Sequence, residues 1–193
     1  MNTQIKDLEV MDYPPLTEDL EEAKEHLDLY GMALIKNVLS SNEVNQMDQR
    51  LTEQFFGEEK HKVGSKVRGD EGLGVESSEE EKVSRLVWNL INKSALFRNL
   101  IQNKEVNNFM EWIFDRKTVH QKYFLSSFQA NILEPGADIQ KLHIDTPVPE
   151  PLPSWPIKAN SIWMIDDFTT DNGSTEVLPK SHKFKFKPNI MDN

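Results

Sequence analysis

The sequence contains no cysteine among its 193 residues. This absence excludes disulfides, thiolate metal ligands and cysteine nucleophiles. Any metal ion must therefore be bound by histidine and carboxylate side chains, which suit a hard or borderline ion.

Long apolar runs and a surplus of positive charge are also missing. No stretch is apolar enough to cross a membrane, and the polar start Met1-Asn2-Thr3-Gln4 does not resemble a signal peptide. The net charge of -10 argues against a nucleic-acid partner, because phosphate binding relies on lysine and arginine. We expect one cytoplasmic domain spanning residues 1–193, which is long enough for a substantial core.

The first half of the chain is patterned mainly as helix. Thr17 precedes two acidic residues and is a plausible N-cap for a helix that stops at Gly31. Apolar residues at 32–38 predict a short buried strand. Helical spacing returns at three later places, over residues 83–91, 97–101 and 106–114.

A second helix is predicted from the pair Ser40 and Glu43, whose spacing is that of a capping box. We expect this helix to run to about Phe56. Residues 57–81 then lose all apolar periodicity and predict a long surface loop, which is either a lid or an irregular excursion without a role.

The pattern changes after His120, where short apolar segments alternate with turn residues. Thr146–Pro156 contains five prolines and must be a loop. The predicted strands and turns lie at 123–133, 134–137, 157–165, 171–174 and 175–179. Helices at about 16–116 followed by strands at about 122–193 are typical of an α+β domain whose catalytic part is a β-sandwich or barrel.

The pair His143 and Asp145 is the main candidate for chemistry. In an extended segment, side chains two residues apart leave the same face, so the imidazole and the carboxylate converge on one point. They supply two thirds of the 2-His-1-carboxylate set that binds non-haem Fe(II) and leaves positions open. As a bare triplet the pattern is common, and its meaning depends on the surrounding sequence.

A basic run at Lys180–Lys187 departs from the acidic average. We interpret it as a solvated edge strand, in which lysine prevents edge-to-edge pairing. Anion binding by part of the run is the alternative.

The order of these features resembles the phytanoyl-CoA dioxygenase family of Fe(II)- and 2-oxoglutarate-dependent oxygenases. The last of the four matching segments is the most distinctive, because it combines an Asn-Gly turn with Leu-Pro-x-Ser-His-Lys. The segments lie at residues 30–40, 131–136, 143–145 and 171–183.

This resemblance implies a fold of N-terminal helices followed by a double-stranded β-helix, which is a cupin-like jelly roll. It implies that His143 and Asp145 bind Fe(II), and that 2-oxoglutarate and molecular oxygen are used to hydroxylate a small organic substrate. It also implies that Asn131 and Trp163 lie beside the cosubstrate. A strand-end hydrogen bond for Asn131 and core packing for Trp163 are the alternatives.

The sequence departs from the family pattern near its end. The family has a second histidine ligand and an arginine for the cosubstrate on late strands, whereas here His182 is the only later histidine and no arginine follows Arg116. His182 occupies a family position that is not a ligand. The resemblance therefore implies an incomplete copy that lacks its C-terminal strands.

Two other functions stay open. One is a catalytically inactive binding or scaffold domain with the oxygenase fold, which the missing ligand and arginine favour. The other is a cupin-type metal enzyme without 2-oxoglutarate, which would have more histidines near the first pair. The sequence predicts neither the substrate nor the oligomeric state.

Overall fold

The computed structural model describes residues 13–68, 72–73, 84–115, 123–137, 139–140, 142–146 and 148–188. These residues form helices and short strands that divide into two compact units. The first unit comprises the described residues of Met1–Val38, Val148–Ser154 and Glu176–Lys187. The second comprises those of Leu39–Pro147, Trp155–Thr175 and Pro188–Asn193. Each unit therefore combines early and late parts of the chain.

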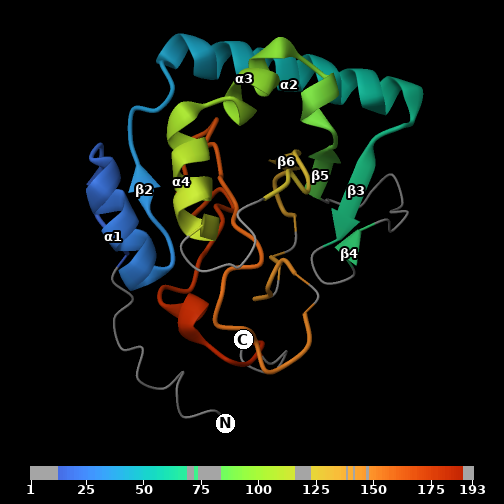
Figure 1. Ribbon diagram of the computed structural model, residues 1–193. Helices are drawn as coiled ribbons and strands as arrows, with labels where there is room; N and C mark the ends of the chain where they lie inside the picture. The colour runs from blue at the N-terminus through green and yellow to red at the C-terminus, as the bar shows by residue number, and fades with distance from the viewer. Residues whose placement is uncertain are drawn as a thin grey trace. The chain divides into compact units, whose positions relative to one another are not determined.

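The first unit contains one long helix and a pair of short parallel strands (Figure 1). Strand β1 (Leu16–Thr17) pairs with β2 (Leu34–Ile35), and helix α1 (Leu20–Tyr30) connects them. The predicted strand at 32–38 is therefore present, but only two of its residues form ladder bonds.

Helix α1 begins at a different cap from the predicted one. The carboxylate of Asp19 accepts hydrogen bonds from the backbone N–H groups of Glu21 and Glu22. Thr17 is not the cap because it belongs to β1, where it is buried and its hydroxyl donates to the Glu22 carboxylate. The helix ends at Gly31 as predicted, in the left-handed conformation with φ 81°.

The C-terminal end of α1 is covered by the distinctive Leu-Pro-x-Ser-His-Lys segment. The backbone N–H of Lys180 donates to the Tyr30 carbonyl at 2.7 Å. His182 lies on the short 3-10 helix η2 (Ser181–Lys183), and its Nε2 is 3.2 Å from the Asp28 carbonyl oxygen. Two backbone carbonyls in the last turn of α1 thus have partners from the end of the sequence.

The basic run is not an edge strand. It starts with η2, and the residue before η2, Lys180, has a left-handed φ of 68° that does not fit a strand. Further on, the Lys185 carbonyl accepts from the Leu152 N–H at 2.8 Å. The strand predicted at 175–179 is also absent from this described part of the chain.

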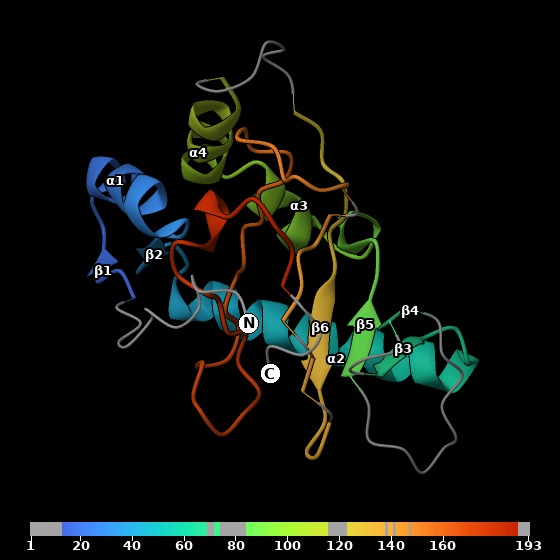
Figure 2. The same cartoon turned by 90° about the horizontal axis from the view of Figure 1, so that it is seen from below.

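The second unit contains a four-stranded antiparallel sheet in the order β4-β3-β5-β6. Figures 1 and 2 show helix α2 passing along this sheet. The strands are β3 (Ser65–Arg68), β4 (Gly72–Leu73), β5 (Ser84–Val87) and β6 (Ala130–Leu133). Three of the four strands, β3, β4 and β5, thus come from the first half of the sequence, which was predicted to be mainly helical.

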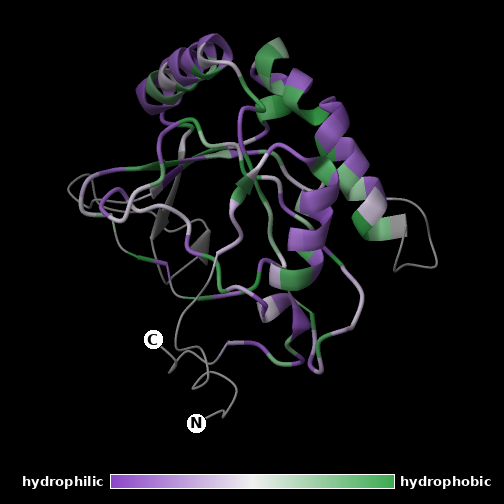
Figure 3. Ribbon diagram, turned by 90° about the vertical axis from the view of Figure 1, so that its left-hand side faces the viewer, coloured by the Kyte–Doolittle hydropathy of each residue, from purple (hydrophilic) through white to green (hydrophobic). Residues whose placement is uncertain are grey.

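Helix α2 (Ser41–His61) begins with the predicted capping box. The Ser40 hydroxyl accepts from the Glu43 N–H, and the Glu43 carboxylate accepts from the Ser40 N–H at 2.9 Å. Hydrophilic and hydrophobic residues are interspersed along the helices (Figure 3), as expected where one side of a helix packs and the other faces solvent.

The end of α2 corrects the first part of the predicted loop at 57–81, whose residues 69–71 and 74–81 lie outside the described residues. The helix continues past Phe56 to His61, and strand β3 starts four residues later. Polar composition concealed the helix, although glutamate and lysine are good helix formers. Glu58 is buried and pairs with Lys93 at 2.8 Å, a contact distant in sequence that holds this last part of α2 in place.

Strand β5 corrects the helix predicted over 83–91. Its residues pair with β3 on one side and β6 on the other, so ladder bonds override the helical spacing of the apolar residues. Asn89 then adopts a left-handed conformation with φ 55°, so no continuous helix can run through 83–91. Arg85 also contacts Glu59 of α2 at 2.5 Å.

The two later helices are confirmed. They are α3 (Ala95–Ile101) and α4 (Lys104–Asp115), and a 3-10 turn η1 (Leu90–Asn92) precedes them. Within the described residues, none of the helices combines the length and apolar character needed to cross a membrane.

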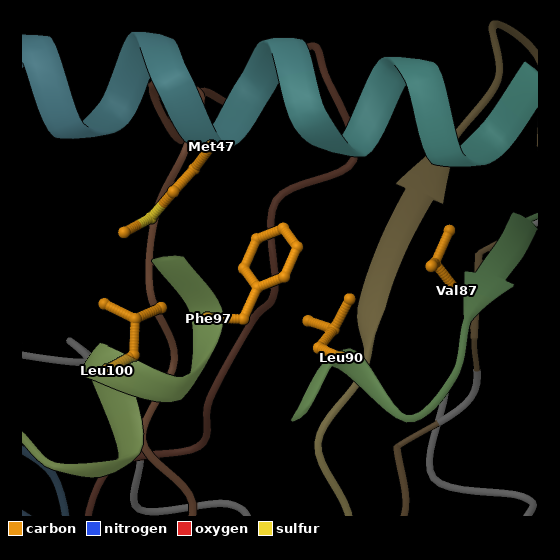
Figure 4. Packing of buried hydrophobic residues seen from close by; sticks show 5 residues of the cluster. All are labelled: Met47, Val87, Leu90, Phe97 and Leu100. Carbon is orange, nitrogen blue, oxygen red and sulfur yellow. The ribbon is translucent and has the colours of Figure 1, made fainter. Parts of the chain in front are cut away.

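The core of the second unit lies where α2, α3, η1 and β5 meet. Figure 4 shows Met47 pointing away from α2, and Val87, Leu90, Phe97 and Leu100 lying opposite the helix. These five buried residues form the core cluster. Several partly buried residues pack on this cluster, among them Ile132, Trp163 and Ile165.

The late strands are shorter than predicted. Only β6 is present from the segment 123–133, and its following turn is confirmed by the 2.9 Å bond from the Ala137 N–H to the Glu134 carbonyl. Segment 157–165 is not a strand, because it has no ladder partner among the described residues. Its side chains nevertheless alternate between partly buried and exposed, as in a strand, with Trp163 partly buried and Ile162 exposed. The mixed helix and sheet class is thus confirmed, whereas the jelly roll stays a prediction.

Candidate metal centre

His143 and Asp145 lie beside each other on the segment that follows the turn after β6. The Nε2 atom of His143 is 3.3 Å from the Oδ1 atom of Asp145. Their side chains are 53% and 46% exposed, so solvent and small molecules reach both. The two donor atoms therefore converge as the spacing of the residues suggested.

The separation of these donors suits a shared metal ion. Imidazole nitrogen and carboxylate oxygen bind divalent metals such as zinc at about 2.0–2.2 Å, so two donors at right angles on one ion lie about 3 Å apart. The observed 3.3 Å is close to this value. The pair can supply two protein ligands and, being half-exposed, leaves the other coordination positions accessible.

Asp145 is also held from a second direction. The side-chain amide of Asn160 donates to the Oδ2 atom of Asp145, and the ammonium group of Lys158 donates to its backbone carbonyl at 3.3 Å. One carboxylate oxygen thus faces His143 while the other accepts a neutral amide donor.

These two contacts were not predicted from the sequence. Asn160 and Lys158 follow Asp145 by 15 and 13 residues, across a proline-rich loop whose path the sequence does not specify. The sequence offered one weak signal for these contacts. Polar residues, among them Lys158 and Asn160, occur in segment 157–165, which otherwise has the apolar character of a strand.

Asn131 and Trp163 have other contacts in the described structure. Asn131 is exposed on β6, and its Oδ1 accepts a 3.3 Å hydrogen bond from Gln129. Trp163 packs against the hydrophobic core cluster. No hydrogen bond or ion pair between described residues joins either one to His143 or Asp145. Their place beside a cosubstrate stays a prediction.

A third ligand is not assigned. The described residues contain no group of three or more histidine and carboxylate side chains arranged to hold a metal ion. His182 lies at the end of α1 in the first unit, with its Nε2 near a backbone carbonyl.

Sequence comparison identifies the family. The profile of the phytanoyl-CoA dioxygenase (PhyH) family matches residues 27–191. The chain belongs to this family. The PhyH match includes the converging pair His143 and Asp145, and it also spans Asn131, Asn160 and Trp163.

Three curated fungal proteins are similar to this PhyH chain, and all are named dioxygenases. Dioxygenase af480 of Aspergillus fumigatus is 28% identical over 179 residues, which cover 92% of this chain and 54% of that protein. Dioxygenase sphC of Aspergillus fumigatus is 25% identical, with 86% and 46% covered. Dioxygenase FUM3 of Gibberella moniliformis is 27% identical, with 86% and 56% covered. The chain thus spans about half the length of these relatives. No solved structure matches it.

Proposed function

We propose that the protein is an Fe(II)- and 2-oxoglutarate-dependent dioxygenase that hydroxylates a small organic substrate. The observation that carries this proposal is the convergence of His143 Nε2 and Asp145 Oδ1, 3.3 Å apart, in a chain of the PhyH family. The similarity to proteins named dioxygenases supports the same class of reaction.

The two ligands have separate requirements. His143 must be neutral at Nε2, because only an unprotonated nitrogen has a lone pair for a metal ion. Asp145 must be ionised, and it offers Oδ1 on the side that faces His143. When bound at this pair, Fe(II) together with 2-oxoglutarate and molecular oxygen would supply the oxidising power that hydroxylation needs.

The remaining parts of the site belong to the same proposal. Asn131 and Trp163 lie beside 2-oxoglutarate, and the segments after β6 contribute to a double-stranded β-helix. The third protein ligand and the basic partner of the distal cosubstrate carboxylate are not assigned to residues of this sequence.

The test is the conversion of 2-oxoglutarate into succinate, which requires no knowledge of the substrate. We expect the purified protein to form succinate only when Fe(II) and oxygen are present, and both His143→Ala and Asp145→Ala to abolish this. His61→Ala is the matched control, because His61 is an exposed histidine on α2. Wild-type turnover by both site variants would exclude the proposal.

A catalytically inactive binding or scaffold domain is the second candidate. The observation in its favour is that the described residues contain no group of three or more histidine and carboxylate side chains that could hold a metal ion. Calorimetric titration with Mn(II) and 2-oxoglutarate separates the two candidates. The inactive domain requires that neither binds, whereas the dioxygenase requires both.

A further inference from the structure

The two carboxylate oxygens of Asp145 have different surroundings. Oδ1 faces His143 Nε2 at 3.3 Å, whereas Oδ2 accepts a hydrogen bond from the Asn160 side-chain amide. From this asymmetry we infer that Asn160 is a positioning residue that fixes Asp145 as a one-oxygen metal ligand. The inference rests on the proposed function and adds to it the role of one further residue.

The reason lies in the two ways a carboxylate can bind an ion. An aspartate binds through one oxygen or through both, and the second mode occupies an additional coordination position. A donor that occupies Oδ2 favours the first mode. It leaves one more position for the cosubstrate and oxygen, which a dioxygenase of the proposed type must bind together.

Asn160 is placed to do this firmly. It lies three residues before Trp163, and Trp163 and Ile165 pack against the core cluster of the same unit. Lys158 adds a 3.3 Å hydrogen bond to the backbone carbonyl of Asp145. The exposed ligand segment is therefore attached at two points to a segment that the core holds.

The chemistry of the side chain also fits. An amide is a neutral donor, so it orients the carboxylate without neutralising it or competing for the metal. An aspartate at position 160 would instead bring a second negative charge to Oδ2 and could bind the ion itself. Asn160→Asp is therefore expected to change the site, although the two side chains have nearly the same shape.

The contact can be tested in the metal-free protein. We expect the side-chain amide signals of Asn160 in a ¹⁵N NMR spectrum to shift when Asp145 is replaced by alanine. Ser161→Ala is the matched control, because this exposed neighbour is adjacent to Asn160 in sequence. Unchanged Asn160 amide signals in Asp145→Ala would show that the contact does not exist and would overturn the inference.

The role is tested by calorimetric titration of the 193-residue chain with Mn(II). We expect Asn160→Ala to weaken binding by about 10- to 100-fold, as is usual when a ligand loses its hydrogen-bond partner, and Ser161→Ala to bind as the wild type does. Circular dichroism checks that the exposed substitution leaves the fold intact. Equal Mn(II) affinity in Asn160→Ala and wild type would overturn this inference alone. Failure of the wild type to bind Mn(II) would overturn the proposed function as well.

Discussion

Gly31 occupies a position that favours glycine, because its backbone conformation is rare for other residues and its surroundings leave little room for a Cβ atom. Its φ of 81° is a conformation that other residues rarely adopt. A Cβ atom at this position would lie 2.3 Å from Nδ1 of His182 and 3.0 Å from its Cβ. The Ser-His-Lys segment can therefore approach the end of α1 this closely because residue 31 has no Cβ atom.

The first prediction concerns Gly31→Ala. We expect it to lower the free energy of unfolding by at least about 1 kcal/mol, the cost of a left-handed alanine, and to displace His182 from the Asp28 carbonyl. Gly57→Ala is the control, because position 57 lies inside α2 and an added Cβ meets nothing within 4 Å. There we expect stabilisation of about 0.5–1 kcal/mol. Urea unfolding measures both, and destabilisation of similar size at the two positions would contradict the explanation.

The candidate site could be predicted from the sequence only in part. The convergence of the His143 and Asp145 side chains followed from their spacing, because a local rule brings side chains two residues apart to one side. Asn160 reaches the same aspartate across a proline-rich loop, and no local rule describes that path. For Trp163 the resemblance to the family predicts a place beside the cosubstrate. In the described structure this side chain packs against the core cluster.

At the scale of elements, the start of α2 has a complete capping box. The Glu43 carboxylate accepts hydrogen bonds from the side chain and the backbone N–H of Ser40 at 2.7 and 2.9 Å. These bonds, the side-chain bond first, hold the pKa of the Glu43 carboxyl below its ordinary value. The stabilisation that the capping box gives to α2 therefore depends on pH.

The second prediction follows from the sign of this shift. Because the pKa of Glu43 is lower in the folded state, its stabilising effect is complete above the unfolded-state pKa and is lost as the pH falls through the folded-state pKa. The difference in free energy of unfolding between wild type and Glu43→Gln should therefore shrink on acidification. Urea unfolding at a series of acidic pH values measures it. In a Ser40→Ala background the pH dependence should be smaller, and a difference constant with pH would refute the coupling.

Elements were predictable where a local signal decides them. The capping box of α2, the glycine after α1 and the Pro-Gly turn after β6 are all short-range patterns, and all three are confirmed. Strand β5 was mistaken for a helix because its apolar residues also fit helical spacing, and its pairing with β3 and β6 is not local. The last turns of α2 were missed because their polar composition shows no apolar periodicity, and a distant partner, Lys93, pairs with Glu58 there.

At the scale of the whole molecule, the five-residue core cluster connects α2, α3, η1 and β5 within the second unit. Phe97 is its largest member and is only 2% exposed. The segment that carries Asn160 is attached to the same cluster through Trp163 and Ile165. Stability of this core and rigidity of the candidate site are therefore linked.

The third prediction tests this core. Phe97→Ala should lower the free energy of unfolding by about 3–5 kcal/mol, because it removes buried apolar surface and leaves a cavity. Phe124→Ala is the matched control, since that side chain is 86% exposed, and its effect should stay within about 0.5 kcal/mol. Similar losses in both variants, measured by urea unfolding, would contradict the assignment of Phe97 to the core.

The central claim is that His143 and Asp145 together bind a divalent metal ion. Its most direct test is a titration with Mn(II), a redox-stable substitute for Fe(II), in which electron paramagnetic resonance measures the ion that stays free. We predict one bound equivalent for the wild type. His143→Ala and Asp145→Ala should each lose more than about 100-fold in affinity, because removing a ligand costs more than removing its hydrogen-bond partner. Binding of Mn(II) by both variants as tight as that of the wild type would contradict the claim.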